Sequence, residues 1–194
     1  MAKRVKPDVD PFYFHYPAGA TIVTSHANGR DNAMAVAWHT AVSRDPPYYV
    51  VSISPKRFTH GLLVESGEFV VNFMPVDRGD LVALVAGCSG SDVDKFDAFD
   101  IAASPGSQVA APILETAFAS YECRVEAQHT FGDHDLFVAR IVAVQWEDSF
   151  FADDGMLDLE RVSPIVYLGE DRYAGAEHAV HIDREVLTRA ALGD

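Results

Sequence analysis

The chain has 194 residues, of which 48% are hydrophobic and 23% are charged, and its formal net charge is −14. A chain of this length can bury a core without disulfides or structural metals, so we expect one domain over residues 1–194, with a C-terminal extension from about residue 170. The acidic balance argues against nucleic acids and anionic membranes as partners, because both attract basic surfaces.

Strand patterns dominate the first part of the chain. Gly19–Ser25 is rich in β-branched residues and leads to Asn28-Gly29, a pair typical of tight hairpin turns. The next run, Ala33–Val42, alternates with a period of two and predicts a single strand. One face of this strand carries larger side chains, namely Met34, Val36, Trp38 and Thr40. The other face carries Ala33, Ala35, Ala37 and Ala41, so we expect a neighbour to pack closely against it.

Strands and helices then alternate. Tyr48–Ser54 and Glu68–Phe73 have the composition of strands, and we expect helices over Thr59–Ser66 and Asp77–Ala86. The following segment, Gly87–Pro112, is rich in Gly, Ser, Asp and Pro. We expect a long excursion there with at most short helices, and loops of this length often carry function.

The remaining patterns complete an antiparallel arrangement. Ala119–Gln128 alternates polar and apolar residues, which predicts a half-exposed strand with Glu122 on its polar face. A turn at Phe131–His134 leads into Leu136–Trp146, which is apolar on both faces and predicts a central strand. A short strand is expected over Ser163–Leu168. Many short strands and few helices predict a closed β-barrel or a sandwich.

The chain ends in a predicted amphipathic helix over Asp183–Leu192, with Asp183 as its N-cap. At the other end, Met1–Pro7 is basic and no apolar run follows it, so we expect no secretory signal. No apolar run is long enough to span a bilayer. Cys88 and Cys123 belong to no CxxC or Cys/His cluster, which argues against a metal site. We expect a reducing cytoplasm as the location.

Common nucleotide and nucleophile motifs are absent from the sequence. It contains no GxGxxG after a strand, no GxxxxGK[ST] and no GxSxG. An acidic run resembles a metal loop, but it lacks the glycine and glutamate positions of a helix-loop-helix calcium site. We interpret it as a solvated loop; its carboxylates are Asp92, Asp94, Asp97 and Asp100.

The segment Ser52–Thr59 runs from a predicted strand into the start of a helix. Free backbone N–H groups and the positive end of the helix dipole favour an anion at such a point. Lys56 and Arg57 add positive charge, and the guanidinium of Arg57 can hold two phosphate oxygens. Ser54 and Thr59 add hydroxyl groups. The same residues also fit an exposed basic turn in which Thr59 caps the helix.

Three other side chains each have two interpretations. Trp38 lies in a strand, where core packing is the commoner role, and the alternative is an aromatic wall for a flat cofactor. Lys95 can pair with its acidic neighbours, and His134 can be an ordinary hairpin-turn residue. The pattern alone favours the structural interpretation of Lys95 and His134.

Several short blocks, taken in order, resemble the flavin reductase-like, FMN-binding split β-barrel family, which includes flavoredoxin-like flavoproteins. Each block is individually weak, but the ordered combination is fairly specific and covers roughly Tyr16 to Tyr173. The blocks are Asn32–Ser43, Pro46-Pro47, Val51–Ile53, Arg57–Thr59, Glu68–Asn72, Ser89-Gly90, Asp94–Phe96, Gly132–His134 and Pro164–Gly169.

The resemblance implies a mainly β fold, a six-stranded antiparallel Greek-key split β-barrel with short flanking helices. It also implies non-covalent FMN at the edge of a homodimer interface, with NADH or NADPH as electron donor. The expected activity is that of a flavin reductase, which feeds a monooxygenase or another acceptor. The alternative is an FMN-binding electron-transfer protein without nicotinamide oxidase activity. In either case the cofactor carries the hydride chemistry, and no protein nucleophile is expected.

The resemblance further assigns cofactor contacts residue by residue. Backbone and amide groups facing the flavin would come from Asn32, Ala33, Met34 and Ala35, and Trp38 would lie beside the ring. Many family members have Thr or Ser in place of Ala35 or Ala37, so here either backbone atoms would carry those contacts or the affinity for the cofactor would be lower.

The phosphate would be held around the predicted helix start by Ser54, Arg57 and Thr59, and Ser52 is a further expected cofactor contact. Lys95 would come from the long loop, of the same chain or across the dimer. His134 and Tyr167 would flank the ring or the nicotinamide approach, and His134 is also a candidate catalytic residue.

Overall fold

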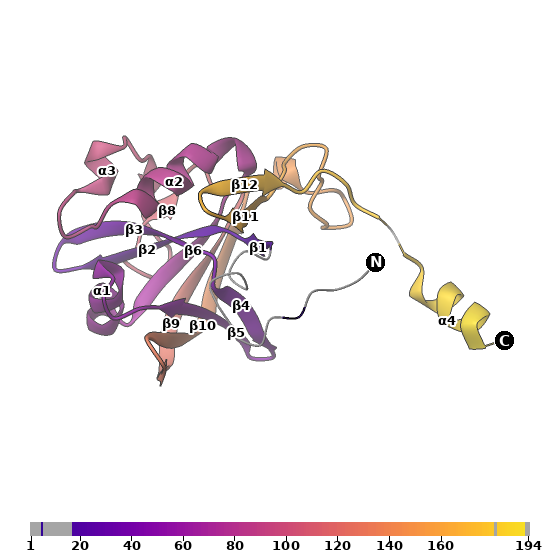
Figure 1. The fold of residues 1–194 in the computed structure, drawn as a ribbon, viewed down its shortest axis with the longest axis horizontal. Coiled ribbons are helices and arrows are strands. Elements are labelled where there is room, and N and C mark those ends of the chain that lie inside the picture. The colour runs from indigo at the N-terminus through magenta and orange to yellow at the C-terminus, as the bar shows by residue number, and fades with distance from the viewer. Residues whose placement is uncertain (1–4, 6–16, 181, 193–194) are drawn as a thin grey trace.

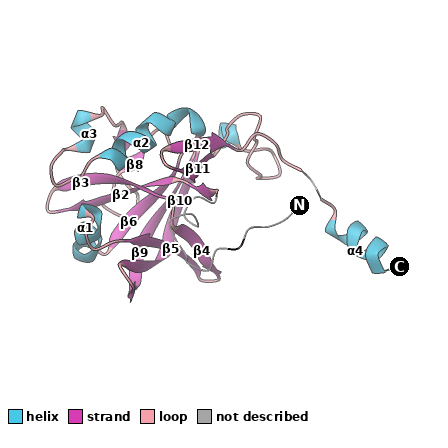
Figure 2. Ribbon diagram, viewed as in Figure 1, coloured by secondary structure: helices cyan, strands magenta, loops and turns pink. Residues whose placement is uncertain are grey.

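A computed structural model describes residues 5, 17–180 and 182–192. Within these residues the fold is mainly β, with short helices on the outside of a large antiparallel sheet (Figures 1 and 2). This arrangement confirms the predicted fold class. Apart from Val5, the segment Met1–Pro7, for which no secretory signal was predicted, lies outside the described residues.

The large sheet has seven strands in the order β3-β2-β6-β9-β10-β5-β4. Their bounds are β2 (Thr21–Ala27), β3 (Arg30–Val36), β4 (His39–Arg44), β5 (Pro47–Ile53), β6 (Glu68–Phe73), β9 (Ala119–Phe131) and β10 (His134–Trp146). A second sheet has three strands, β1 (Ala18–Gly19), β11 (Ile165–Gly169) and β12 (Arg172–Gly175). A third sheet pairs β7 (Ala103–Ser104) with β8 (Ile113–Leu114).

The helices are short and occur close to their predicted positions. They are α1 (Phe58–Ser66), the 3-10 helix η2 (Val76–Arg78), α2 (Gly79–Gly87), α3 (Lys95–Ala98), the 3-10 helix η3 (Asp148–Phe150) and α4 (Arg184–Leu192). Helix α4 begins directly after Asp183, the predicted N-cap, and Figure 1 shows it apart from the sheet. Among the helices of the described chain, none combines the length and apolarity needed to cross a bilayer.

The prediction of one strand over Ala33–Val42 is wrong. The chain bends at Ala37-Trp38 and divides into β3 and β4, which lie at opposite ends of the sheet order. Only two residues join these edges, so the sheet must curl until they meet. The amide of Ser52 in β5 donates to the carbonyl of Trp38 over 2.9 Å. The bend therefore closes the barrel and gives seven strands rather than six.

The two faces of β3 contact different cores, as the alternation predicts. On the inner face, Val36 packs with residues of the barrel interior and with Leu63 of α1. On the outer face, Ala33 packs with Val82 and Val85 of α2, which runs over this side of the sheet (Figure 1). The small alanine side chains let this helix approach closely.

Strand β9 departs from its predicted half-exposed character at one residue. Glu122, expected on the polar face, is completely buried. The loop over residues 105–111 covers it, and its carboxylate accepts hydrogen bonds from Ser107, Gln108, Val109 and Gln145. At Glu122 the polar face of β9 therefore contacts the polar groups of this loop and not solvent.

A second buried carboxylate joins β10 to α1. Asp135 Oδ2 lies 2.6 Å from His60 Nε2 and accepts a hydrogen bond of 2.6 Å from Gln128. The hydrogen bond with His60, followed by those with Thr130 and Gln128, lowers the pKa of Asp135 from 3.8 to about 2. The ionised form of Asp135 is therefore favoured by folding.

We expect Asp135→Asn to make the free energy of unfolding less dependent on pH in acid. The folded-state pKa lies below the ordinary value, so ionised Asp135 stabilises the wild type fully above pH 3.8. That contribution is lost as pH falls through about 2. Urea unfolding of wild type and Asp135→Asn across the acid range measures this contribution to the free energy of unfolding. A stability difference that stays constant to the lowest pH would contradict the assignment.

Candidate functional site

A cavity of about 330 Å³ lies where β3 meets the start of α1 and the end of α2. We call it the β3–α1 cavity. Five of the predicted cofactor-binding residues line it: Met34, Ala35, Arg57, Thr59 and Lys95. The other lining residues are Lys56, Phe58, Val85, Ala86, Gly87, Cys88, Ser89 and Gly90. The five predicted residues come from three segments of the chain, 22 to 61 positions apart in the sequence, and thus meet at one point.

The lining of this cavity is positively charged in a chain that is otherwise strongly acidic. Lys56, Arg57 and Lys95 all contribute to it, and none of its lining residues carries a carboxylate. A few local cations are enough to build an anion site even when the net charge is −14. The charges on the walls therefore match an anionic ligand.

The start of α1 adds backbone donors to these cations. Arg57 is the N-cap, in an extended conformation, and its side chain makes no capping hydrogen bond. The first N–H groups of a helix have no acceptor within the helix, and the dipole makes this end positive. Phe58 and Thr59, which carry two of those groups, both line the cavity. Oriented amides and cations thus converge on the same space.

Thr59 does not cap the helix, so this part of the alternative interpretation is wrong. The cap position is Arg57, and Thr59 is buried inside the first turn. Its hydroxyl oxygen accepts a hydrogen bond of 2.8 Å from Asn32 Nδ2. This leaves the hydroxyl hydrogen of Thr59 free to donate to another acceptor. Asn32 is therefore one layer behind the cavity wall and orients Thr59.

Lys95 is a buried lysine that joins β3 to α2 within one chain. Its ammonium group donates to the carbonyls of Ala33 at 2.8 Å and Val85 at 2.6 Å, and its residue is only 3% exposed. Burial lowers the pKa of Lys95, Cys88 raises it and Arg57 lowers it further. The positive charge of Lys95 offsets the negative C-terminal end of α2. This end of the helix therefore does not repel an anion in the cavity.

The position of Lys95 is fixed by the acidic loop that precedes it. Asp94 is the N-cap of α3, and its carboxylate accepts from the amides of Phe96 and Asp97. The structural interpretation of Lys95 supposed that it pairs with its acidic neighbours. Asp94 instead accepts from backbone amides and does not pair with Lys95.

A second cavity of about 200 Å³ continues along β3, and we call it the tyrosine cavity. It shares Ala35 and Ala86 with the β3–α1 cavity. Tyr167 and Tyr173 form one wall, with their ring centroids 5.4 Å apart. Burial, together with Asp171 and Tyr167, raises the pKa of Tyr173. The remaining lining residues are Ala20, Val36, Ala37, Val82 and Asp171.

Taken together, the two cavities suit a ligand with an anionic end and a flat, apolar body. The cations lie at the α1 end, and alanine methyl groups and tyrosine rings lie at the other. Ligand sites are commonly of this kind, mostly apolar with a few convergent polar groups.

Trp38, Ser52 and His134 form a separate group that lines neither cavity. Trp38 is 43% exposed, so core packing is the wrong interpretation for it. Its ring centroid lies 4.8 Å from that of His134, whose Nδ1 is 2.8 Å from Asp133 Oδ1. Roles for these residues in cofactor binding stay predictions. Ser54 is buried below the basic turn, where its carbonyl accepts from the amide of Arg57.

Sequence reasoning missed the wall opposite α1, which consists of the end of α2 and the loop after it. Of this wall, only Ser89-Gly90 belongs to a block of the family resemblance. The helix end over Val85–Gly87 shows no local pattern that distinguishes it from the rest of α2. Its proximity to the site follows from the packing of α2 on β3.

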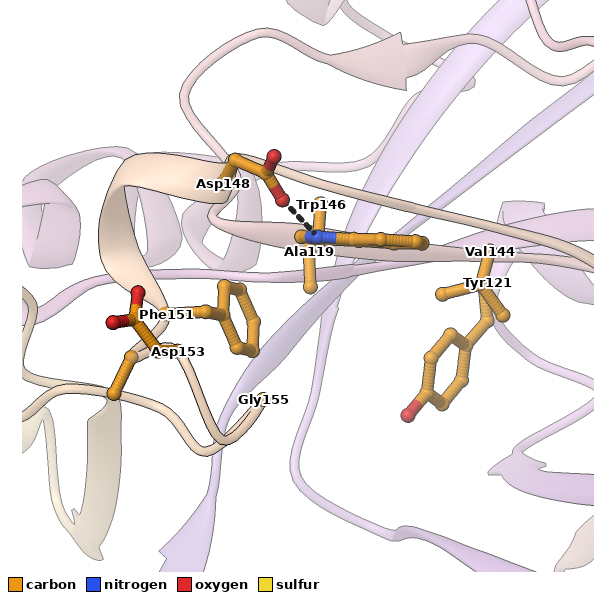
Figure 3. A pocket seen from close by; sticks show the side chains of 9 residues that line it. Ala119, Tyr121, Val144, Trp146, Asp148, Phe151, Asp153 and Gly155 are labelled. Atoms are coloured by element: carbon orange, nitrogen blue, oxygen red, sulfur yellow. Dashed lines mark hydrogen bonds between the residues drawn. The ribbon is translucent and has the colours of Figure 1, made fainter.

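The described residues also contain a larger cavity of about 520 Å³, shown in Figure 3. Tyr121, Trp146 and Phe151 line it, together with the carboxylates Asp148 and Asp153 and no basic residue. The indole N–H of Trp146 donates to Asp148 over 2.7 Å. These charges would repel a phosphate, so this cavity does not match the anion site.

Comparison with known families agrees with the geometry. The model of the flavin reductase like domain matches residues 13–174, which include every residue that lines the two cavities along β3. The chain belongs to this family. Relatives of the chain include an NADH-dependent flavin reductase and the reductase components of a resorcinol hydroxylase and of a 4-nitrophenol 4-monooxygenase.

Individual relatives cover most of the domain. The FMN-binding protein from Thermus thermophilus, solved with bound 1-cyclohex-2-enone, has a TM-score of 0.81 and 37% identity, over 94% of this chain and 99% of that one. The NADH-dependent flavin reductase StyB of Pseudomonas fluorescens is 30% identical over 74% of this chain and 83% of its own.

Two other relatives differ more in length. The reductase component of a FADH(2)-dependent resorcinol hydroxylase from Rhizobium is 32% identical over 66% of this chain and 70% of its own. A protein of Aeropyrum pernix is 31% identical over 86% of this chain, and this chain spans 63% of that relative, less than two-thirds of its length.

Proposed function

We propose that this flavin reductase-like protein binds FMN non-covalently and reduces it with NADH or NADPH. The observation that carries the proposal is the β3–α1 cavity, where three cations and the start of α1 converge and no carboxylate lines the wall. A phosphate monoester is the part of FMN that such a set of donors recognises. The FMN-binding neighbour from Thermus thermophilus supports the choice of FMN.

The two cavities divide the binding of this cofactor between them. Arg57 and Lys56 would hold the phosphate, with the hydroxyl of Thr59 and the first amides of α1. The isoalloxazine ring would extend over Ala35 and toward Tyr167. Alanine at these positions of β3 would let a flat ring approach the backbone, whose N–H groups then replace the hydroxyl groups of other family members.

Bound FMN would supply the hydride-accepting chemistry, and the protein residues would supply position. Holding the nicotinamide against the ring converts a bimolecular reaction into one within a complex. His134 is partly buried and lies in ring contact with the exposed Trp38, and we propose that it flanks that approach from there. No side chain is required as a nucleophile.

The reductase activity rests on relatives whose names state it, and a carrier without nicotinamide oxidase activity is the alternative. The Thermus thermophilus neighbour is named for FMN binding and not for nicotinamide oxidation, which fits either one. We therefore distinguish binding from turnover in the test.

Anaerobic mixing of the FMN-loaded protein with NADH or NADPH is expected to bleach the visible absorbance of the oxidised flavin. Stopped-flow absorbance measures the rate with each donor. Bleaching by dithionite but by neither nicotinamide would favour the carrier. Arg57→Ala, tested at equal FMN concentration, checks that the signal comes from bound flavin.

We further propose that the protein is a single-domain, cytoplasmic homodimer that passes reduced flavin to a monooxygenase or another acceptor. Both cysteines are free, as expected in a reducing compartment. Exposed apolar side chains on β4 and β10, including Val42, Val144 and Trp146, provide surface for a second copy. Light scattering after gel filtration measures the mass, and a monomer at micromolar concentration would contradict the dimer.

A further inference from the structure

Arg30, at the start of β3, bridges two elements that no strand pairing connects. Its guanidinium carbon lies 5.0 Å from the centroid of the Phe58 ring, at the start of α1. Its Nη2 donates a hydrogen bond to the carbonyl of Gly90, in the loop after α2. A guanidinium favours this combination of stacking and hydrogen bonding. We call Arg30, Phe58 and Gly90 the Arg30 latch.

Gly90 packs so tightly against the start of α1 that no side chain fits between them. It is buried, and a Cβ atom at this position would lie 2.0 Å from Asn32 Oδ1 and 2.7 Å from Phe58 Cδ1. Asn32 cannot yield easily, because its amide is bound to Thr59 at 2.8 Å. The loop after α2 is therefore in direct contact with α1 at this point, and only glycine permits the approach.

The contact between Phe58 and Gly90 closes the wall of the β3–α1 cavity beside its cations. Both residues line the cavity, and in the sequence Phe58 lies between Arg57 and Thr59. Arg30 is not a lining residue, so its guanidinium lies behind this wall. A ligand that ends in a phosphate fits within the wall, whereas a ligand that continues beyond its phosphate has to leave by another route or part the wall.

We propose that the Arg30 latch makes the site selective for mononucleotide over dinucleotide flavins. FMN ends in a phosphate monoester, whereas FAD continues through a pyrophosphate to adenosine. With the latch closed, the adenylate part has no path between Phe58 and Gly90. This inference rests on the proposed binding of flavin by the β3–α1 cavity and adds the determinant that separates two chemically similar ligands.

The test compares wild type with Arg30→Ala and Arg30→Lys, using FMN, FAD and riboflavin as titrants in calorimetry. Wild type is expected to bind FMN at least tenfold more tightly than FAD. In Arg30→Ala the ratio of the FAD to the FMN dissociation constant should fall at least tenfold. Arg30→Lys keeps the charge but lacks the planar fork, so it should shift the ratio in the same direction.

Two controls separate the latch from charge and from phosphate binding. Arg140→Ala removes an exposed arginine paired with Glu126 on the surface and should leave the ratio unchanged. The preference of Arg30→Ala for FMN over riboflavin should also stay within about threefold of wild type, because Arg30 lies behind the wall. A selective loss of FMN relative to riboflavin would make Arg30 a phosphate ligand and overturn the latch.

Failure of the latch and failure of the proposed function give different results. A wild type that binds neither FMN nor riboflavin overturns both. A wild type that binds FMN and FAD equally, or variants with the wild-type ratio, overturns the latch and leaves flavin binding intact. Gly90→Ala gives a second way to displace the wall if Arg30→Ala does not fold, and the ratio should fall there too.

Discussion

Replacing Arg57 with alanine is expected to weaken FMN binding more than tenfold while leaving the fold unchanged. Arg57 is exposed at the N-cap of α1 and makes no capping hydrogen bond, so its removal leaves no buried group unpaired. A charge-assisted hydrogen bond contributes about 1.5–3 kcal/mol, and a bidentate contact to phosphate more. Titration of the quenching of flavin fluorescence measures the change.

Riboflavin makes this prediction specific to the phosphate. Because riboflavin has no phosphate, Arg57→Ala should bind it with nearly wild-type affinity. Lys56→Ala, which removes the neighbouring exposed cation, should weaken FMN binding less, since an ammonium group offers a point charge and no planar fork. Equal FMN affinity in Arg57→Ala and wild type would show that the anion site lies elsewhere.

Much of the fold follows from local signals in the sequence. The pair Asn28-Gly29 forms the hairpin between β2 and β3, and Glu68–Phe73 has the bounds of β6. Alternation along β3 separates Val36 in the barrel from Ala33 under α2. These features depend on side-chain period and turn chemistry within a few residues, and such information is present in any short window of the sequence.

The division at Ala37-Trp38 depends on distant parts of the chain. Alternation continues through both residues, so the local pattern gives no reason to bend there. The bend is required because β3 and β4 are the two edges of one sheet. The bend brings the two edges together at the hydrogen bond between the Ser52 amide and the Trp38 carbonyl, which a continuous straight strand would not form.

The candidate site was predictable at its α1 end and less so elsewhere. The basic turn at Lys56-Arg57 before a helix has a physical meaning in the sequence itself. Lys95 has none, since its partners are the carbonyls of Ala33 and Val85, and backbone groups leave no mark on residue identity. The Arg30 latch was missed for the same reason, because Arg30 acts through the carbonyl of Gly90.

Glu122 shows the same limit in the core, and it leads to the largest expected loss of stability. Polar residues alternate with apolar ones along β9, so the pattern places Glu122 in solvent. Its exposure is 0%, because the loop over residues 105–111 folds over the sheet. The amides of Gln108 and Val109 donate to one carboxylate oxygen at 2.6 and 3.0 Å, and the Ser107 hydroxyl donates to the other at 2.6 Å. The carboxylate thus organises the loop around it.

We expect Glu122→Ala to lower the free energy of unfolding by about 1.5–3 kcal/mol at neutral pH, the usual contribution of a hydrogen bond to a charged group, because the buried amide of Val109 loses its acceptor. The amide of Gln108 and the side chains of Ser107 and Gln145 also lose this acceptor, but these residues are exposed and water can replace it. Glu122→Gln keeps one acceptor oxygen and should lose about half as much. Urea unfolding followed by circular dichroism measures both, with the exposed Glu177→Ala as control.

The pH dependence gives the same prediction a second test. Burial by itself raises the pKa of Glu122, but the hydrogen bonds from Ser107, Gln108 and Gln145 outweigh it and leave the pKa below the ordinary 4.5. Ionised Glu122 therefore stabilises the fold fully above pH 4.5 and progressively less as pH falls below it. The difference between wild type and Glu122→Ala should shrink in acid. A difference below about 1 kcal/mol at neutral pH, a typical value for a single neutral hydrogen bond, would show that the loop does not depend on this carboxylate.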